Sequence, residues 1–512
     1  MSVDCNMKTG EFQKLNSRKL PRVMIAAGSS GSGKTTMMMG LLDLFTKRGE
    51  RIAAYKCGPD YIDPMFHRKV LGVPSENLDS FFMREGALIS VLNRCPGEMA
   101  LIEGVMGIYD GMSMDNTLAS CYEVAKISRT PIVLLVDAKG VGRTVISVVK
   151  GLLSDDAEGL IKGIILNRVT SKTFEMLKEP MEKALLDAGY DAKLLGYLPT
   201  MKDISIESRH LGLKLPHEIE DIKEKLALLS EQIGSSVDID MLVEIAEEAK
   251  EISLRDDNAK EFAYADTGYD LGSHVNGQDG GLNCDSFKLA VARDEAFCFY
   301  YEDNLRLLNE MGVETVTFSP IHDEKLPEGV DGLLIGGGYP ENYLKELSEN
   351  KSMLGSVRKA IDGGMPYLAE CGGFMYLHKG IESVDGEIFP MVGAIDASVS
   401  YKGKLVRFGY VEINASKQDC SNAEIDCESQ NEDADGMRLS LYLNGMKGHE
   451  FHYYDSTDNG ERCVAKKPMK DICWDCMHSD ERSLAGFPHL YYRSCPEFAK
   501  GFVDAMKKYK GK

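Results

Sequence analysis

The 512-residue sequence lacks the features that mark membrane-spanning, secreted or nucleic-acid-binding proteins. No apolar run is long enough to span a bilayer, and residues 1–20 mix charges without the apolar stretch of a secretory leader. A basic surplus is missing too, because the net charge is -21. That charge argues against nucleic acid or an anionic membrane as the main partner. We therefore expect small molecules as substrates. If a substrate is acidic, its binding site needs only a local group of Lys and Arg side chains.

A disulfide framework is also missing, because the 13 cysteines are odd in number and follow no regular spacing. Free thiols indicate a reducing, cytoplasmic compartment. With 43% hydrophobic and 27% charged residues the composition is that of a soluble globular protein. The length exceeds what one hydrophobic core usually organises, so we expect at least two domains.

The pattern along the chain predicts two α/β domains. Short apolar runs alternate with helical patterns within residues 1–257, which predicts a parallel sheet with helices on both faces. Residues 258–285 are rich in Gly, Asp, Asn and Ser and are interpreted as an interdomain linker. A second α/β series occupies residues 286–512, interrupted by an acidic surface insertion at residues 422–435. The expected strands are Val23–Ala27, Ile52–Tyr55, Met99–Glu103, Ile132–Asp137, Ile164–Asn167, Leu289–Arg293, Gly332–Ile335 and Tyr367–Ala369.

A phosphate-binding loop follows the first expected strand. Gly28-Ser-Ser-Gly-Ser-Gly33-Lys34-Thr35 matches G-x-x-x-x-G-K-[ST] and is followed by a helical pattern from Thr36. We expect the phosphate oxygens to bind backbone N–H groups of this loop and of the helix start. The residues concerned are Gly28, Ser32, Gly33 and Thr36. In this arrangement Lys34 reaches the outer phosphates and Thr35 ligates Mg²⁺. We therefore expect ATP as a substrate.

Carboxylates suited to Mg²⁺ or to substrate activation follow later strands. They are Asp60, Asp63, Glu103 and Asp110, and hard oxygen ligands are those that Mg²⁺ prefers. Each of them taken alone is equally consistent with a helix cap or a turn. Asn167 ends another expected strand, where its amide would read the adenine edge or simply form a turn.

A thiol nucleophile is indicated in the second domain. Cys371 lies between the strand-like Met365–Leu368 and the helical pattern Phe374–Lys379, and a sharp turn there would expose its thiol. Backbone N–H groups of the glycine-rich segment that includes Gly337 and Gly338, and that of Gly372, could form an oxyanion hole. A base is supplied by His449 or His452. A buried cysteine and core histidines are the alternative interpretation.

Taken together, these motifs resemble one family, the cobyrinic acid a,c-diamide synthases of cobalamin biosynthesis. The resemblance extends from about residue 22 to residue 502. The motifs that carry it are the phosphate loop, Lys56–His67, Glu103–Gly111, Ser208–Leu213, Gly336–Glu341, Glu370–Gly373 and Gly448–Tyr453. It implies a dethiobiotin-synthetase-like domain fused to a class I glutamine amidotransferase domain with a flavodoxin-like fold. Position 29 is Ser, where the related partitioning ATPases carry a second Lys, and this weakens a regulatory interpretation.

The resemblance also assigns roles to individual residues. It places Cys371 at the nucleophile and makes His452 the base, because related cobyric acid synthases share only the second histidine of this motif. Asp60 and Glu103 fall on metal positions, with Thr35. Asp63 and Asp110 fall on positions of substrate activation. Lys56, Arg209 and His210 are candidates for holding substrate carboxylates, and each is equally consistent with an ordinary surface charge. Tyr454 stands where triads of this superfamily have Glu, so we expect a Cys-His dyad or an orienting group from elsewhere.

The function implied is ATP- and glutamine-dependent amidation of the a and c carboxylates of cobyrinic acid, a corrin polycarboxylate. Alternatives are the same amidation on hydrogenobyrinic acid or nickel sirohydrochlorin and, further off, a P-loop regulator with a silent amidotransferase domain. A homodimer is compatible with the sequence. One cluster lies outside the family pattern, Cys463, Cys473, Cys476 and His478, and we interpret it as a loop with free thiols in preference to a zinc site.

Overall fold

A computed structural model describes residues 18–201, 222–252, 287–416 and 438–511. The chain divides into two compact units, Met1–Tyr264 and Ala265–Lys512, and each is described by itself. The expected linker, the acidic insertion, Arg209 and His210 lie outside the described residues. None of the helices in the described part of the chain has the length and apolar character needed to cross a membrane.

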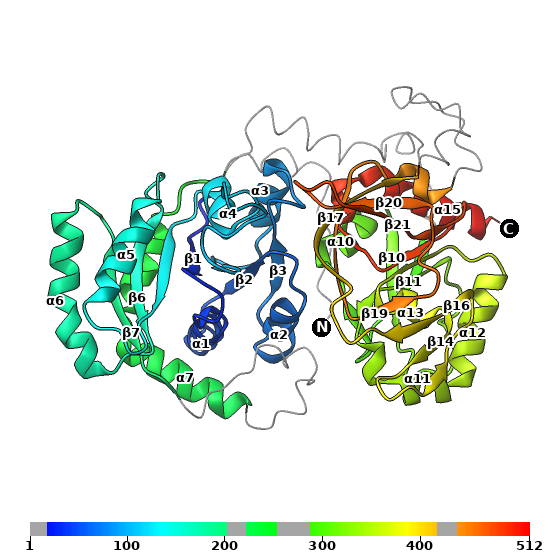
Figure 1. The fold of residues 1–512 in the computed structure, drawn as a ribbon, viewed down its shortest axis with the longest axis horizontal. Helices are drawn as coiled ribbons and strands as arrows, with labels where there is room; N and C mark the ends of the chain where they lie inside the picture. The colour runs from blue at the N-terminus through cyan, green and yellow to red at the C-terminus, as the bar shows by residue number, and fades with distance from the viewer. Residues whose placement is uncertain (1–17, 202–221, 253–286, 417–437, 512) are drawn as a thin grey trace, which may run out of the picture. The chain divides into compact units, whose positions relative to one another are not determined.

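The first unit is built on a sheet of seven parallel strands, in the order β3-β2-β4-β1-β5-β6-β7. Figure 1 labels β3, β2 and β1 in one half of this sheet and β6 and β7 in the other. Every residue of β1, β2 and β4 is buried, so both faces of the sheet centre are covered. Residues of α1, α7 and α8 share one apolar cluster with β1 and β4. The elements are β1 Arg22–Ala27, α1 Lys34–Lys47, β2 Ile52–Cys57, α2 Ile62–Val70, β3 Ser75–Leu78, α3 Glu85–Asn93, β4 Met99–Glu103, α4 Cys121–Ser128, β5 Ile132–Asp137, α5 Thr144–Ser154, β6 Ile161–Asn167, α6 Ser171–Asp187, β7 Lys193–Leu198, α7 Ile222–Ser236 and α8 Ile239–Glu247.

The second unit has a central sheet in the order β10-β8-β11-β13-β23-β22, parallel except for the last pair. Alternate residues of its strands enter two separate apolar clusters, as the two-residue period of a strand requires: Leu333 and Ile335 of β11 enter one cluster and Leu334 the other. The elements of the central sheet and of the helices are β8 Phe287–Ala292, β9 Phe297–Phe299, α10 Glu302–Glu310, β10 Val313–Phe318, β11 Gly332–Ile335, β12 Gly337–Gly338, α11 Leu344–Glu349, α12 Lys351–Asp362, β13 Tyr367–Glu370, α13 Gly372–Tyr376, β22 His478–Ser479, β23 Leu484–Gly486 and α15 Pro496–Lys510.

Two further sheets of the second unit are not foreseen by the sequence patterns. One has the order β15-β14-β16-β19 and the other is the antiparallel sheet β21-β20-β17-β18-β24. Their strands are β14 His378–Glu382, β15 Ile388–Pro390, β16 Ile395–Tyr401, β17 Arg407–Ala415, β18 Met446–His452, β19 Tyr454–Ser456, β20 Cys463–Lys466, β21 Cys473–Cys476 and β24 His489–Leu490. Strand β18 ends at His452 and pairs with both β17 and β24.

The predicted α/β class with two α/β units is confirmed, with local corrections. The helix expected over Phe374–Lys379 is wrong, because α13 ends at Tyr376 and β14 begins at His378. His378 Nδ1 donates a hydrogen bond to the Phe374 carbonyl at 2.7 Å. The imidazole therefore bonds a carbonyl near the end of α13 that the backbone N–H of residue 378 would bond if the helix continued. The segment with Cys473 and Cys476 is a strand and not a loop. Strand β3, Ser-Glu-Asn-Leu, carries too few apolar residues to be found from sequence, and strands β7 and β10 were also not predicted.

Candidate active sites of the two units

The phosphate loop is a backbone cradle between β1 and α1. Gly33 has φ of 92°, in the left-handed region, and a Cβ atom there would lie 2.5 Å from Asn167 Nδ2. The Asn167 side chain, at the end of β6, donates to the Ser32 carbonyl at 2.7 Å. Asn167 therefore holds the loop from the neighbouring strand, and its contact with adenine stays a prediction. Only glycine fits at position 33 because both the conformation and the space exclude a side chain.

Lys34 is folded over the loop. Its Nζ donates to the carbonyls of Ser29 at 3.0 Å and Met106 at 2.5 Å. Burial lowers the pKa of Lys34, with nearby Glu103 and Asp110 acting in the opposite direction. A buried cation whose contacts are neutral carbonyls is well suited to a more strongly charged partner such as phosphate.

A buried ion cluster lies at the ends of β2 and β4, beside the loop. Lys56 Nζ is 2.7 Å from Glu103 Oε1 and 2.5 Å from Asp63 Oδ2. The Thr35 hydroxyl donates to the same Glu103 oxygen at 2.6 Å. Burial raises the pKa of the Glu103 carboxyl, and the Lys56 ammonium opposes that effect. The structure thus brings together two residues expected to bind metal, Thr35 and Glu103, and two expected to act on the substrate, Lys56 and Asp63.

Glu103 has one carboxylate oxygen left over. Its Oε2 is buried and has no hydrogen-bond partner among the described residues, and the side chain is fully buried. Such an orphaned oxygen is costly unless a further group binds it. Together with the Thr35 hydroxyl, it fits the few protein ligands that Mg²⁺ takes when nucleotide phosphates supply the rest.

The two remaining carboxylates of the first unit organise loops. Asp60 Oδ1 accepts from the N–H groups of Ile62 at 2.8 Å and Asp63 at 3.2 Å, as a cap at the start of α2. Asp110 Oδ2 accepts from the Gly107 N–H at 2.8 Å. The capping interpretation left open for Asp60 is therefore what the structure shows. Direct roles of Asp60 and Asp110 in metal binding or activation stay predictions.

The cysteine cluster of the second unit forms part of a sheet. Cys463 and Cys476 are cross-strand neighbours in β20 and β21, both buried, whereas Cys473 is exposed. Each of the nine cysteines in the described ranges is a free thiol. Among these same residues there is no group of three or more His, Cys, Asp or Glu arranged to hold a metal ion. Cys463 and Cys476 are therefore buried residues of this sheet, and all three cysteines of the cluster are free thiols, as predicted.

Cys371 occupies a strained turn between β13 and α13. Its φ of 48° and ψ of -104° are unusual for a residue with a side chain. The Cys371 N–H donates to the Gly486 carbonyl at 2.8 Å, which anchors the turn to β23. Burial raises the pKa of the Cys371 thiol, as do the nearby carboxylates Glu341 and Glu450, while the Gly372 N–H opposes them. The thiol therefore needs a base before it can attack.

Glycines surround this turn because neighbouring backbone leaves no room. A Cβ on Gly372 would lie 3.2 Å from the Gly338 nitrogen and 2.8 Å from Pro340 Cδ. The backbone of Gly338 is therefore beside the nucleophile turn, as an oxyanion hole formed with Gly372 would require. At Gly337 a Cβ would lie 2.3 Å from His489 Cε1, so this position is fixed by close packing. An oxyanion role for each of the three glycines stays a prediction.

We expect Gly373→Ala to destabilise the second unit by roughly 3 kcal/mol or more, because the turn cannot accept a side chain. The new Cβ would lie 2.0 Å from the Ile335 carbonyl oxygen, a backbone atom that cannot move aside. Chemical denaturation of the full chain measures this. The matched control is Gly355→Ala on α12, where nothing lies within 4 Å. Equal stability of both variants would contradict the packing described for the turn.

His452 ends β18 and presents one free ring nitrogen. Its Nδ1 is 2.6 Å from the Tyr454 carbonyl and must donate to it, so Nε2 of the neutral ring is the acceptor. That Nε2 is buried and without a hydrogen-bond partner among the described residues. Tyr454 thus accepts a hydrogen bond from the ring through its main chain, at the position where the sequence has no Glu side chain. The expected orienting group from elsewhere has a candidate in this carbonyl.

Two neighbours of His452 were missed by the sequence analysis. The Phe487 ring stacks on the His452 imidazole, with 4.0 Å between the ring centroids and an interplanar angle of 5°. Phe487 directly follows Gly486, whose carbonyl accepts a hydrogen bond from the Cys371 N–H. These two neighbouring residues therefore connect the turn that carries Cys371 to the His452 ring. Glu450 Oε2, buried and without a hydrogen-bond partner in the described part of the chain, is 4.0 Å from His452 Nε2. Glu450 and His452 are two residues apart, so both lie on one face of the strand. This spacing could have indicated from the sequence that Glu450 is a neighbour of His452.

His449 points to the other face of β18. Its Nδ1 is 3.1 Å from the Tyr301 hydroxyl. Its ring stacks on the ring of His489, with 4.8 Å between the centroids. Burial lowers the pKa of His449 to about 3, so the ring stays neutral. These contacts support His452 over His449 as the base.

Family models match both units. Residues 23–213 match the CobQ/CobB/MinD/ParA nucleotide binding domain, and residues 288–492 match the CobB/CobQ-like glutamine amidotransferase domain. Proteins named cobyrinate a,c-diamide synthase are similar over nearly the whole chain. The one from Caldanaerobacter subterraneus subsp. tengcongensis is 36% identical over 488 residues, covering 94% of this chain and 97% of its own. The protein of Fusobacterium nucleatum is 36% identical and covers 92% of this chain and 97% of its own length. That of Clostridium tetani is 34% identical and covers 94% of this chain and 99% of its own length.

The two family models, one over the unit with the phosphate loop and one over the unit with the cysteine turn, define a glutamine amidotransferase that uses ATP for amidation. The chain belongs to the CobB/CobQ family, among relatives named cobyrinate a,c-diamide synthase. This confirms the family and the P-loop ligase class that the motifs predicted.

Proposed function

We propose that the protein amidates the a and c carboxylates of cobyrinic acid, using ATP to activate each carboxylate and glutamine as the source of ammonia. The observation that carries this proposal is the likeness to cobyrinate a,c-diamide synthases over 94% of the chain, which includes both sites. The reducing, cytoplasmic compartment expected from the cysteines belongs to the same proposal.

In the second unit the chemistry starts at the Cys371 thiol. His452 Nε2 takes the thiol proton, and the sulfur attacks the side-chain carbonyl of glutamine. The N–H groups of Gly338 and Gly372 stabilise the oxyanion, and the His452 imidazolium protonates the departing ammonia. Water then hydrolyses the thioester to glutamate. The Tyr454 carbonyl keeps the imidazole in the tautomer that this sequence of steps needs.

In the first unit the residues hold a nucleotide and a carboxylate together. Lys34 stabilises the charge of the outer phosphates while the substrate carboxylate attacks the γ-phosphorus, which gives an acyl phosphate and ADP. Ammonia then displaces phosphate and leaves the amide. The Lys56 ammonium, held by Asp63 and Glu103, is placed to bind the reacting carboxylate. Thr35 and Glu103 would hold Mg²⁺, which supplies charge neutralisation of the phosphates.

The substrate is tested by mass analysis of each candidate acid incubated with the protein, ATP and glutamine. We expect two hydroxyl-to-amino exchanges on cobyrinic acid and none without ATP. Conversion of hydrogenobyrinic acid or nickel sirohydrochlorin in place of cobyrinic acid would reassign the substrate within the same chemistry. If no acid is converted and glutamine is not hydrolysed, the regulatory alternative replaces the proposal.

A further inference from the structure

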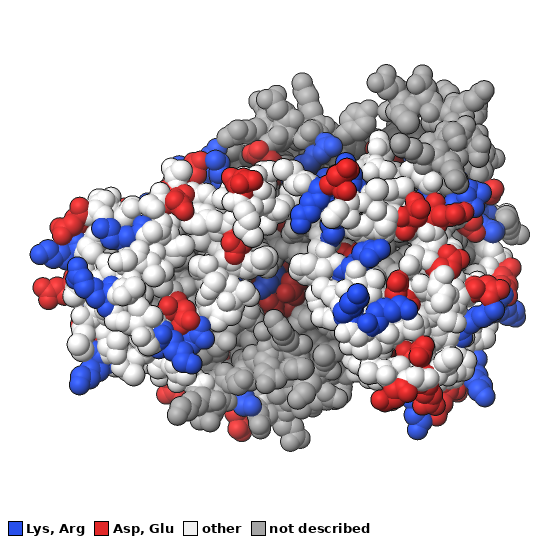
Figure 2. Space-filling model, viewed as in Figure 1, with Lys and Arg blue, Asp and Glu red and all other residues white. Residues whose placement is uncertain are grey.

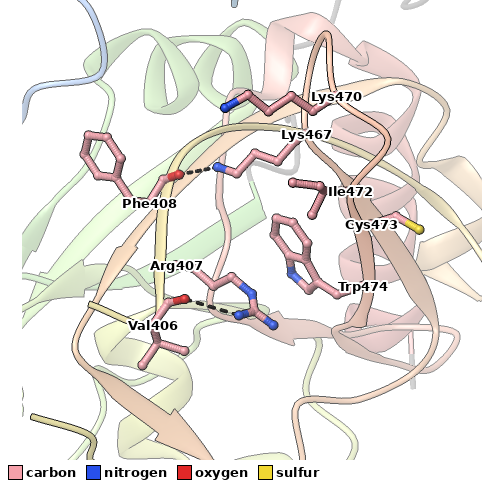
Figure 3. Close-up of a pocket in the computed structure, with 8 residues that line it drawn as sticks. All are labelled: Val406, Arg407, Phe408, Lys467, Lys470, Ile472, Cys473 and Trp474. Carbon is pink, nitrogen blue, oxygen red and sulfur yellow. Dashed lines mark hydrogen bonds between the residues drawn. The ribbon is translucent and has the colours of Figure 1, made fainter. Parts of the chain in front are cut away.

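A pocket of about 290 Å³ opens on the antiparallel sheet of the second unit (Figure 3). It is formed by the start of β17 and by β21 with the turn that precedes it. Trp474, the only tryptophan in the sequence, contributes its ring. The remaining lining residues are Val406, Arg407, Phe408, Lys467, Lys470, Ile472 and Cys473.

Three cations gather at this pocket in a protein whose net charge is -21. The Arg407 guanidinium lies 4.8 Å from the centroid of the Trp474 ring, and Lys467 Nζ lies 5.8 Å from it. Lys467 Nζ donates to the carbonyls of Phe408 and Tyr410, the latter at 3.2 Å. No carboxylate within the described ranges forms an ion pair with Arg407, Lys467 or Lys470. Among the described residues the cluster therefore offers positive charge that no carboxylate pairs directly, and Glu450 acts on Lys467 without forming an ion pair.

The surroundings of Lys467 favour an anionic ligand. Burial lowers the pKa of Lys467, and Lys470 and Arg407 lower it further, with only Glu450 acting in the opposite direction. Anionic groups bound among the three cations would relieve their mutual repulsion. One carboxylate would not balance three cations, so the charge pattern fits a ligand with several carboxylates.

The apolar part of the pocket adds a second requirement. Trp474 presents a flat ring, and Phe408 and Ile472 beside it are 61% and 54% exposed. A conjugated ring system would stack on the indole and cover these side chains, with its carboxylates directed to the cations. Glutamine has neither a ring nor more than one carboxylate and would leave most of these groups unused.

The pocket is one strand away from the proposed base. In the β17–β18 ladder Arg407 is the cross-strand partner of His452. A ligand on Arg407 would therefore be held by the strand next to the one that carries the ammonia-producing chemistry. This neighbourhood is expected of a compound that receives the ammonia.

We propose that the pocket formed by Arg407, Lys467, Lys470 and Trp474 is a binding subsite for a polycarboxylate with a conjugated ring system. This inference rests on the proposed function, under which the ligand is the tetrapyrrole acid, held through carboxylates that are not reacting. The second unit then contributes to binding of the acid as well as to production of ammonia.

The test is binding of cobyrinic acid to the full-length protein without ATP, measured by ultrafiltration and the absorbance of the acid. We expect Arg407→Gln/Lys467→Gln to raise Kd at least tenfold and KM for the acid to a similar extent. Its glutamine hydrolysis should stay within threefold of the native rate, because neither side chain takes part in that step. The matched control is Lys345→Gln/Lys359→Gln on α11 and α12, which removes the same charge elsewhere on the unit and should leave Kd unchanged.

Each outcome decides the matter. Unchanged Kd and KM in the double variant, or an equal loss in the control, would overturn the subsite while leaving the proposed function intact. If the native protein neither binds nor converts any of the three candidate acids, the proposed function itself fails. Should the double variant not fold, the exposed Lys470→Glu reverses a charge at the rim without removing a packed side chain. Native affinity in that variant would equally overturn the subsite.

Discussion

Cys371→Ala is expected to lower glutamine hydrolysis at least about 1,000-fold while leaving amidation driven by added ammonium close to native. The thiol sits in the strained turn with φ of 48°, beside glycine backbone that no side chain can replace. No other group in this turn offers a comparable nucleophile. The first unit has its own phosphate loop and carboxylates, so it needs only ammonia from any source.

The measurement compares glutamate release with ADP formation in the presence of glutamine or ammonium chloride. The control is Cys473→Ala, because Cys473 is an exposed thiol of the same unit. Its glutamine hydrolysis should equal that of the native protein. Glutamine hydrolysis that persists in Cys371→Ala would contradict the assignment of the nucleophile.

Lys34→Met is expected to have the opposite effect, a loss of ATP-dependent amidation of about 1,000-fold or more with glutamine hydrolysis retained. Methionine keeps most of the side-chain length but removes the charge that the carbonyls of Ser29 and Met106 now hold. Without that charge the outer phosphates lose their main protein cation.

ADP formation with the tetrapyrrole acid and ammonium measures this effect without any contribution from the second unit. The control is Lys47→Met at the end of α1, whose partners are Asp43 one helical turn away and the Ser230 hydroxyl of α7. This surface pair contributes little to stability, so native activity is expected. Full activity in Lys34→Met would rule out the phosphate loop as the site of activation.

Local motifs predicted the parts of the structure that depend on local sequence. The phosphate loop and the Cys371 turn each follow a buried parallel strand, and such strands are recognisable as short apolar runs. The bounds expected for Met99–Glu103, Ile132–Asp137 and Gly332–Ile335 agree with the strands observed. A binding loop or nucleophile turn at the end of a strand is specified by a motif of about ten residues. It could therefore be predicted without knowing which distant segments pair with it.

The parts that were missed depend on pairing between distant segments. Strand β17 pairs with β18 and β20 across the segment of residues 417–437, and no local pattern reveals that register. The stacking of Phe487 on His452 and the pocket around Trp474 follow from this pairing. The acceptor for His452 Nδ1 is a main-chain carbonyl, which leaves no trace in residue identity. Side-chain motifs therefore predicted the nucleophile and base but not what orients them.

The most direct test of the central claim is the fate of nitrogen from amide-labelled glutamine. The native protein is incubated with [¹⁵N-amide]glutamine, cobyrinic acid and ATP, and the product is examined by mass spectrometry. The account predicts ¹⁵N in both new amides and one ADP formed for each amide. Amides formed without ATP, or ATP-dependent amides that carry no label, would contradict it.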